Sequence, residues 1–352
     1  MDQLTVATLA DRLVRRHPDR DRLGSATASL AESLVELGRR SPAGSCLIIG
    51  GSLSRGEPCI RASAGAWTLH SDLDLLLVHD DVLPPVLPAT FSSFLENELP
   101  NADVMTLSSG QFAALDTSLG YDFKENGIVL SEGSVPAFES TSITPRDARE
   151  ILAYTIFIYL WEALGLRSAQ GEVSADLDYS YCRLTLKALR TVVMLHGGYA
   201  YHFDGELPDD LRRLLTSELA AHDALDNVPV LPAERFLPVM SLALEAHTAR
   251  FGVGPMDAVS GTEYQGRPGS DYVTVHQQLA FEYMGALVRE TDGGADQSKL
   301  PFLLQDVWRQ VMARHPEIKA AETPAAYFER NKRSIQQTLL MMKLPAAPAS
   351  QL

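Results

Sequence analysis

Two aspartates separated by one leucine stand in the stretch HSDLDLLLVHD, at positions 72 and 74. The apolar residues around them predict a β-strand, and residues two apart on a strand point to the same face of a sheet. Two carboxylates that project together repel each other unless a cation lies between them. Asp72 and Asp74 therefore form a candidate site for hard divalent cations, which in pairs clamp the attacking and leaving oxygens of a displacement at phosphorus.

A glycine-rich turn lies earlier in the chain, in the segment LIIGGSLSRGE. Gly50 and Gly51 end a predicted strand, and Ser52 opens a helical turn. Glycine allows the backbone to approach a ligand closely, and N–H groups at the start of a helical turn can hold phosphate oxygens. A phosphate-binding turn followed by an acidic strand is the layout of a nucleotidyl-transfer site.

The segments GGSLSRGE and SDLDLLLV together resemble the signature of the DNA polymerase β-like nucleotidyltransferase superfamily, in the form seen in small-molecule and antibiotic nucleotidyltransferases. The resemblance covers residues 50–107. That signature includes a third acid on a later strand, and Asp103 in NADVMTL has the matching apolar–acid–apolar context. A solvated aspartate at the edge of a sheet would give the same local pattern at position 103.

The resemblance assigns roles to individual residues. It implies that Asp72, Asp74 and Asp103 are catalytic and bind two Mg²⁺ ions, with Asp103 completing one metal site beside the nucleophile. It implies that Gly51 and Ser52 hold the β- and γ-phosphates of a nucleoside triphosphate, for which ATP is the expected choice. The full set of expected nucleotide-binding residues is Gly50, Gly51, Ser52, Arg55, Ser71 and Lys187.

The insertion PCIRASAGAWTLH, between Glu57 and Ser71, departs from the family pattern. It is longer than the usual spacer, and we expect it to form a hairpin extension. The roles of Arg55 and Glu57 depend on how this insertion folds.

A basic stripe in the later half of the chain is a second candidate contact for the triphosphate. Arg183, Lys187 and Arg190 recur at helical spacing, away from the apolar stripe of the same segment. In the family, a lysine from the helical domain commonly binds the triphosphate, and Lys187 is the matching position. A solvated face paired with neighbouring acids is the alternative interpretation.

The apolar periodicity predicts how the chain is organised. Two helices are expected over residues 3–40, the second with Ser25 as its N-cap, followed by short strands at 46–50, 73–78, 102–107 and 127–130 and a helix at 88–99. Beyond residue 134 only helices are expected, at 145–166, 178–197, 208–222, 233–251, 272–291, 300–314 and 324–343.

These elements predict an α+β fold, a small mixed β-sheet nucleotidyltransferase domain with flanking helices, followed by an all-helical C-terminal domain. We expect residues 1–140 to form the first domain, 141–345 a helical substrate- and nucleotide-binding domain, and 346–352 a disordered tail.

The composition limits the partners. The formal net charge of −15 would repel a long polyanion and argues against dedicated nucleic-acid binding. The three cysteines have no metal-ligand spacing, which favours the cytoplasm. The most apolar run, ILAYTIFIYLWEALGL, is interrupted by Glu162 and predicts a buried helix, not a membrane span.

The sequence therefore predicts a Mg²⁺-dependent nucleotidyltransferase that moves a nucleoside monophosphate, with AMP from ATP as the expected case, to a hydroxyl of a small molecule and releases pyrophosphate. An acidic protein suits a cationic or neutral acceptor, such as an aminoglycoside-like sugar or an antibiotic-pathway compound. Two alternatives stay open: a toxin-like enzyme that modifies tRNA or a protein side chain, and a nucleotide-binding scaffold without activity.

Overall fold

The computed structural model describes most of the chain as two compact units, Met1–Ser140 and Thr141–Leu352. The boundary expected from the sequence lies between residues 140 and 141. The described residues are 4–17, 20–58, 60–63, 66–69, 71–80, 87–100, 102–131, 133–140, 142–163, 177–199, 232–255, 270–291 and 300–315.

A four-stranded mixed sheet forms the centre of the N-terminal unit, with the strand order β5-β4-β1-β6. Strand β1 (Ser45–Ile49) runs antiparallel to β4 (Leu73–His79) and to the short β6 (Ile128–Val129). Strand β5 (Ala102–Ser108) runs parallel to β4, and helix α4 (Ala89–Glu98) lies between them in the chain. The small mixed sheet expected from the sequence is confirmed.

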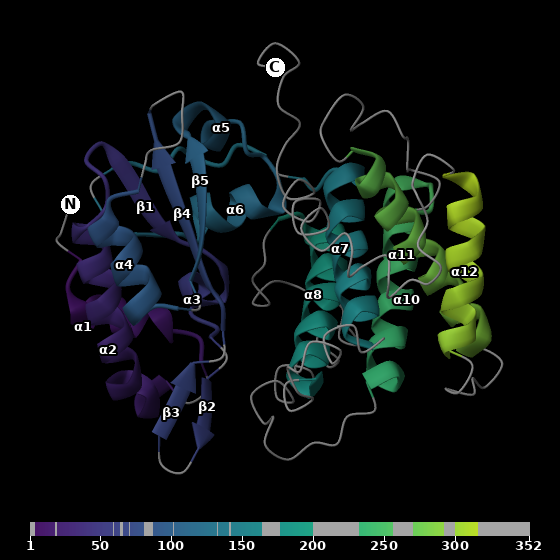
Figure 1. The fold of residues 1–352 in the computed structure, drawn as a ribbon, viewed down its shortest axis with the longest axis horizontal. Coiled ribbons are helices and arrows are strands. Elements are labelled where there is room, and N and C mark those ends of the chain that lie inside the picture. Colours follow the sequence, from purple (N-terminus) through teal and green to yellow (C-terminus); the bar gives the residue numbers. More distant parts are fainter. Residues whose placement is uncertain are drawn as a thin grey trace. The chain divides into compact units, whose positions relative to one another are not determined.

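One face of this sheet packs against helices α1 (Val6–Leu13), α2 (Arg20–Arg39) and α4 (Figure 1). Alternate strand residues supply the apolar side chains of that core, because successive residues on a strand point to opposite faces. The buried members on the strands are Leu47, Ile49, Leu73, Leu75, Leu77 and Ile128.

Short helices connect the strands elsewhere in the unit. Helix α3 (Gly51–Arg55) follows β1 directly, α5 (Ser109–Ala113) follows β5, and α6 (Ser118–Glu125) precedes β6. Helix α6 lies close to the end of β1. A β-carbon at Gly50, which directly follows β1, would be 2.5 Å from Cε1 of Phe123 in α6.

The expected hairpin in the insertion is present as strands β2 (Ile60–Ser63) and β3 (Ala66–Leu69). The two strands pair antiparallel in a separate two-stranded sheet, with Ile60 opposite Leu69 and Ser63 opposite Ala66.

The described residues of the second unit form helices and no strand. They are α7 (Pro145–Ala163), α8 (Leu177–Gly197), α10 (Pro232–Phe251), α11 (Ser270–Thr291) and α12 (Leu300–Arg314). Helix α8 packs against α7 and α10, and α11 packs against α7 and α12 (Figure 1). Within the described residues, no helix is long and apolar enough to cross a membrane.

Helix α2 begins at Arg20, so Ser25 lies inside the helix and the prediction that it is the N-cap is wrong. The helices expected at 208–222 and 324–343, and the tail 346–352, lie outside the described residues.

Candidate active site

Asp74 and Asp103 are neighbours on adjacent parallel strands. Asp74 of β4 is the register partner of Asp103 of β5. Leu73, Leu75 and Val104 belong to the core on one face of the sheet, so the two aspartates point to the opposite face. Asp74 is half-buried and Asp103 is exposed. The sheet therefore brings together two acids that stand far apart in the sequence.

Asp72 lies one residue before β4 begins and is half-buried. Within the described ranges, no group of three or more histidine, cysteine, aspartate or glutamate side chains could hold a metal ion. The third carboxylate of the expected set is thus not gathered with the other two in this arrangement. Two carboxylates are nevertheless a suitable donor set for Mg²⁺, which commonly binds through one or two carboxylates, several waters and substrate phosphates.

The glycine turn is held against β4 by a backbone hydrogen bond and by close packing against a side chain of the strand. The N–H of Gly50 donates a 2.9 Å hydrogen bond to the carbonyl of Asp74. Gly51 has a φ of 69°, in the left-handed region that favours glycine. A β-carbon at position 51 would lie 2.1 Å from Oδ2 of Asp74. The turn and the acidic strand are therefore in direct contact, and only glycine fits at position 51.

The second glycine amide is also used inside the protein. The N–H of Gly51 donates a 2.9 Å hydrogen bond to Oδ2 of Asp122, in helix α6. Ser52 is half-buried, and its hydroxyl makes no hydrogen bond to any residue of the described part. The Ser52 hydroxyl can therefore bind a ligand, whereas the N–H groups of Gly50 and Gly51 already have acceptors.

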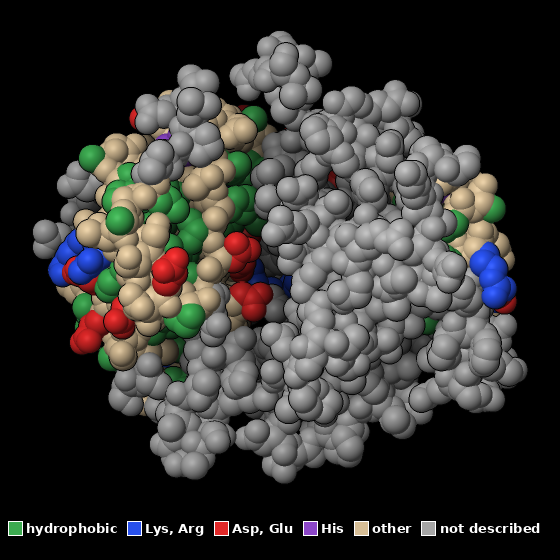
Figure 2. Space-filling view, in the orientation of Figure 1, with side chains coloured by type: hydrophobic (Ala, Val, Ile, Leu, Met, Phe, Trp, Pro, Cys, Tyr) green, Lys and Arg blue, Asp and Glu red, His purple; other side chains and the backbone are tan. Residues whose placement is uncertain are grey.

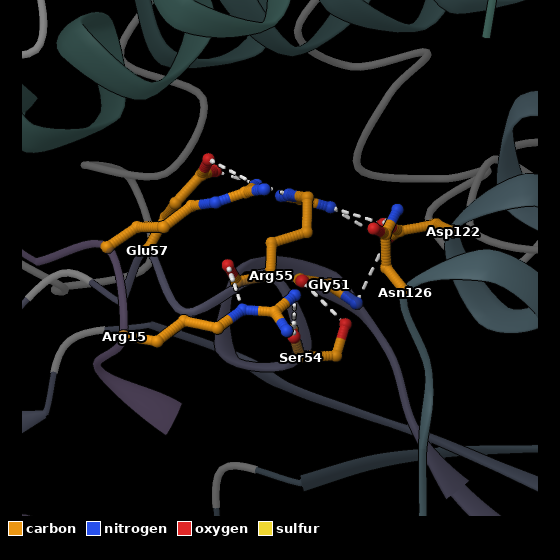
Figure 3. A network of polar contacts seen from close by, with 8 residues as sticks. Arg15, Gly51, Ser54, Arg55, Glu57, Asp122 and Asn126 are labelled. Carbon is orange, nitrogen blue, oxygen red and sulfur yellow. Dashed lines mark hydrogen bonds and ion pairs between the residues drawn. The ribbon is translucent and has the colours of Figure 1, made fainter. Parts of the chain in front are cut away.

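A buried ionic network lies behind the turn (Figure 3). Nη1 of Arg55 is 2.7 Å from each carboxylate oxygen of Asp122, and its Nε is 3.3 Å from Oε2 of Glu57. The Arg55 and Asp122 side chains are 8% and 10% exposed. Two carboxylates therefore hold the Arg55 guanidinium, which the sequence suggested as a nucleotide contact.

Two arginines of the α1 region extend this network. Arg16 is 3.7 Å from Glu57, and Arg15 donates weakly to the carbonyls of Ser54 and Arg55, at the end of α3. Burial lowers the pKa of Arg15, and the neighbouring Arg16 and then Arg12 lower it further. The C-terminal end of α3 is thus tied to the N-terminal helices by cationic side chains, a favourable arrangement for a helix end.

The other two expected nucleotide contacts, Ser71 and Lys187, belong to different units of the chain. Ser71 is buried, immediately before Asp72. Lys187 belongs to α8 of the helical unit, where its Nζ lies 4.7 Å from the centre of the Tyr154 ring, a cation–π contact.

Asp122 is the functional candidate that the sequence did not reveal. It stands 71 residues from its partner Gly51, within the short helix α6 and outside the segment that resembles the family signature. In the segment SLGYDFKE, Asp122 is not part of a recognised motif. Nothing in the sequence therefore distinguishes it from a solvent-exposed residue of a helix.

Comparisons of the chain with models of protein families, with curated proteins and with solved structures gave no match.

Proposed function

We propose that this protein is a divalent-metal-dependent nucleotidyltransferase of the DNA polymerase β-like type. The observation that carries the proposal is the contact between Gly51 of the glycine–serine turn and Asp74, one of two acids on neighbouring strands. Gly51 lies against the Asp74 carboxylate, and Asp103 is the register partner of Asp74. In this proposal a phosphate-binding turn thus adjoins an acid that binds the metal, and a second such acid lies on the next strand.

The donor set suits Mg²⁺, because all of its members are carboxylate oxygens. Asp74 and Asp103 would hold the ion. When bound, the ion would neutralise the charge that develops on the transferred phosphoryl group. The protein's own contribution is largely positioning, which is the main source of rate in phosphoryl transfer.

Each group of this site has a separate task in the proposed reaction. The Ser52 hydroxyl donates to a phosphate oxygen of the triphosphate. Asp103, the most exposed of the three acids, lies where an acceptor hydroxyl can approach and can take its proton as the hydroxyl attacks the α-phosphorus. Pyrophosphate leaves, and the acceptor carries the nucleoside monophosphate.

The charge of the protein favours a small cationic or neutral acceptor. The net charge is −15, and acidic side chains lie at several places on the visible face of the N-terminal unit (Figure 2). Such a surface attracts a polyamine-like sugar and repels the phosphates of RNA. We infer AMP transfer from ATP to a hydroxyl of an aminoglycoside-like compound as the first case to test.

Incubation of the protein and Mg²⁺ with each α-labelled nucleoside triphosphate tests the proposal. Three acceptor pools are offered separately: small metabolites including aminoglycosides, tRNA, and total protein. Label in the small-molecule pool is the expected result. Label in tRNA or protein would keep the reaction and change the acceptor class, and absence of label in every combination would contradict nucleotidyl transfer.

A further inference from the structure

The buried carboxylate of Asp122 connects two parts of the glycine turn. Its Oδ2 accepts the Gly51 N–H at 2.9 Å, and both of its oxygens lie 2.7 Å from Nη1 of Arg55. Gly51 begins helix α3 and Arg55 ends it. One side chain of α6 therefore holds both ends of α3.

This connection reaches the acidic strand through Gly51. The space for a β-carbon at Gly51 is filled by the Asp74 carboxylate, and the Gly50 amide is bonded to the Asp74 carbonyl. Protein interiors are close-packed, so a displaced turn displaces the groups that touch it. The position of the Asp74 carboxylate thus depends on a turn that Asp122 holds.

Burial makes this restraint strong. Asp122 and Arg55 are both almost fully excluded from water. A charge-assisted hydrogen bond in such surroundings is stronger than one at the surface, and loss of Asp122 removes one of the two carboxylates that compensate the buried Arg55 charge. Glu57 accepts from Arg55 on its other side, so the guanidinium is held between two carboxylates.

We propose that Asp122 is a positioning residue of the active site: it fixes α3 and the Gly51 turn, and through them the Asp74 carboxylate. In this assignment Arg55 acts on the site through Asp122 and the backbone of α3, without touching the nucleotide. The assignment rests on the proposed nucleotidyltransferase function.

Steady-state kinetics of label transfer in Asp122→Asn and Asp122→Ala test this assignment. A misplacement of catalytic groups by about 1 Å lowers rates about 100-fold, so we expect kcat to fall about 10-fold in the asparagine variant and about 100-fold in the alanine variant. The KM for the nucleotide should change less than kcat, because Asp122 does not touch it. Should the alanine variant fail to fold, the asparagine variant decides.

Glu150→Gln is the matched control, because Glu150 is a buried carboxylate that pairs with an arginine, Arg146, at 2.7 Å in the helical unit. It should lower the melting temperature with kcat unchanged. If the Asp122 variants behave in the same way, with a lower melting temperature and an unchanged kcat, the positioning role is wrong.

Amide hydrogen exchange separates this inference from the proposed function. An asparagine at position 122 offers one acceptor oxygen, for which Gly51 and Arg55 must compete, so the Gly51 amide should exchange at least about 10-fold faster than in the wild type. Glycine-selective ¹⁵N labelling follows that amide even in a protein that transfers no label. Unchanged Gly51 exchange in Asp122→Asn would overturn the positioning role, whereas absence of transfer by the wild type would overturn only the proposed function.

Discussion

The α-carbon of Gly51 lies so close to the Asp74 carboxylate that a β-carbon at position 51 would be 2.1 Å from Oδ2. The two residues belong to different elements, the start of α3 and the second position of β4. This contact joins the turn that would bind phosphate to the acid that would bind metal. Their relative position is therefore set by direct packing.

Gly51→Ala should abolish most of the transfer activity, because the new methyl group must push the Asp74 carboxylate aside. We expect a loss of about 100-fold in kcat, the size of effect that a misplacement of about 1 Å produces. Gly44→Ala is the control: Gly44 has a similar φ of 76°, but a β-carbon there would meet nothing within 4 Å. In both variants the alanine in a left-handed conformation should lower the free energy of unfolding by about 1–2 kcal/mol. Equal activity of the two variants would contradict the account.

Arg55→Leu should destabilise the N-terminal unit strongly, because it leaves the buried Asp122 carboxylate without its cation. Removing one partner of a buried ion pair costs about 3–5 kcal/mol. Combining it with Asp122→Asn, which removes the orphaned charge, should recover part of that loss. Urea unfolding of the wild type, both single variants and the double variant measures the coupling. Strictly additive effects would mean that Arg55 and Asp122 do not stabilise each other.

Lys187→Met should raise the KM for the nucleoside triphosphate by about tenfold, equivalent to about 1.4 kcal/mol, if Lys187 binds the triphosphate. It should also remove the cation–π contact with Tyr154, worth about 0.5–1 kcal/mol of stability. Tyr154→Leu removes the same contact but keeps the ammonium, so it should lower stability with little change in KM. An unchanged KM in Lys187→Met would reduce the lysine to a structural role.

His247 should make the stability of the helical unit depend on pH. Its ring is fully buried, and Nδ1 lies 3.2 Å from the carbonyl of Val253. Burial lowers the pKa of His247, and the nearby Arg149 lowers it further, against the opposing effect of backbone carbonyls. The unfolded chain then binds a proton more readily than the folded chain. Stability is thus complete above the ordinary histidine pKa of about 6.5 and decreases as the pH falls below it.

Melting temperatures between pH 8 and pH 5 test this dependence. His247→Asn keeps a donor for the Val253 carbonyl and removes the titrating ring, so its profile should be flatter than that of the wild type. His196→Asn is the control, because His196 is exposed and also contacts a backbone carbonyl through Nδ1. Identical profiles for His247→Asn and the wild type would show that His247 does not contribute.

The sequence predicted the described elements well where the pattern was periodic or strongly apolar. The strands around Leu47 and Leu75, and the helices that contain Lys187 and His247, were expected close to their observed bounds. The start of α2 was misplaced because Ser25 has the chemistry of an N-cap, whereas the helix continues back to Arg20. Local capping preference is weaker than the packing that extends a helix.

The candidate site was predictable only in part. The spacing of Asp72 and Asp74 shows which residues can share a strand face, and strand context suggested Asp103. The pairing of Asp74 with Asp103 and the bonding of Gly51 to Asp122 are products of tertiary structure. Such partners lie far apart in the chain, so no short-range pattern reveals them.

Transfer of α-labelled nucleotide by Asp74→Asn tests the central claim most directly. Asparagine keeps the shape of the side chain and removes the charge that would hold a metal ion. Asp80→Asn is the control, because Asp80 is an exposed aspartate just beyond the other end of the same strand. The account predicts that Asp80→Asn transfers label like the wild type, whereas Asp74→Asn loses about 100- to 1,000-fold, the usual cost of removing one preorganised electrostatic group. A folded Asp74→Asn variant that transfers label at the wild-type rate would contradict it.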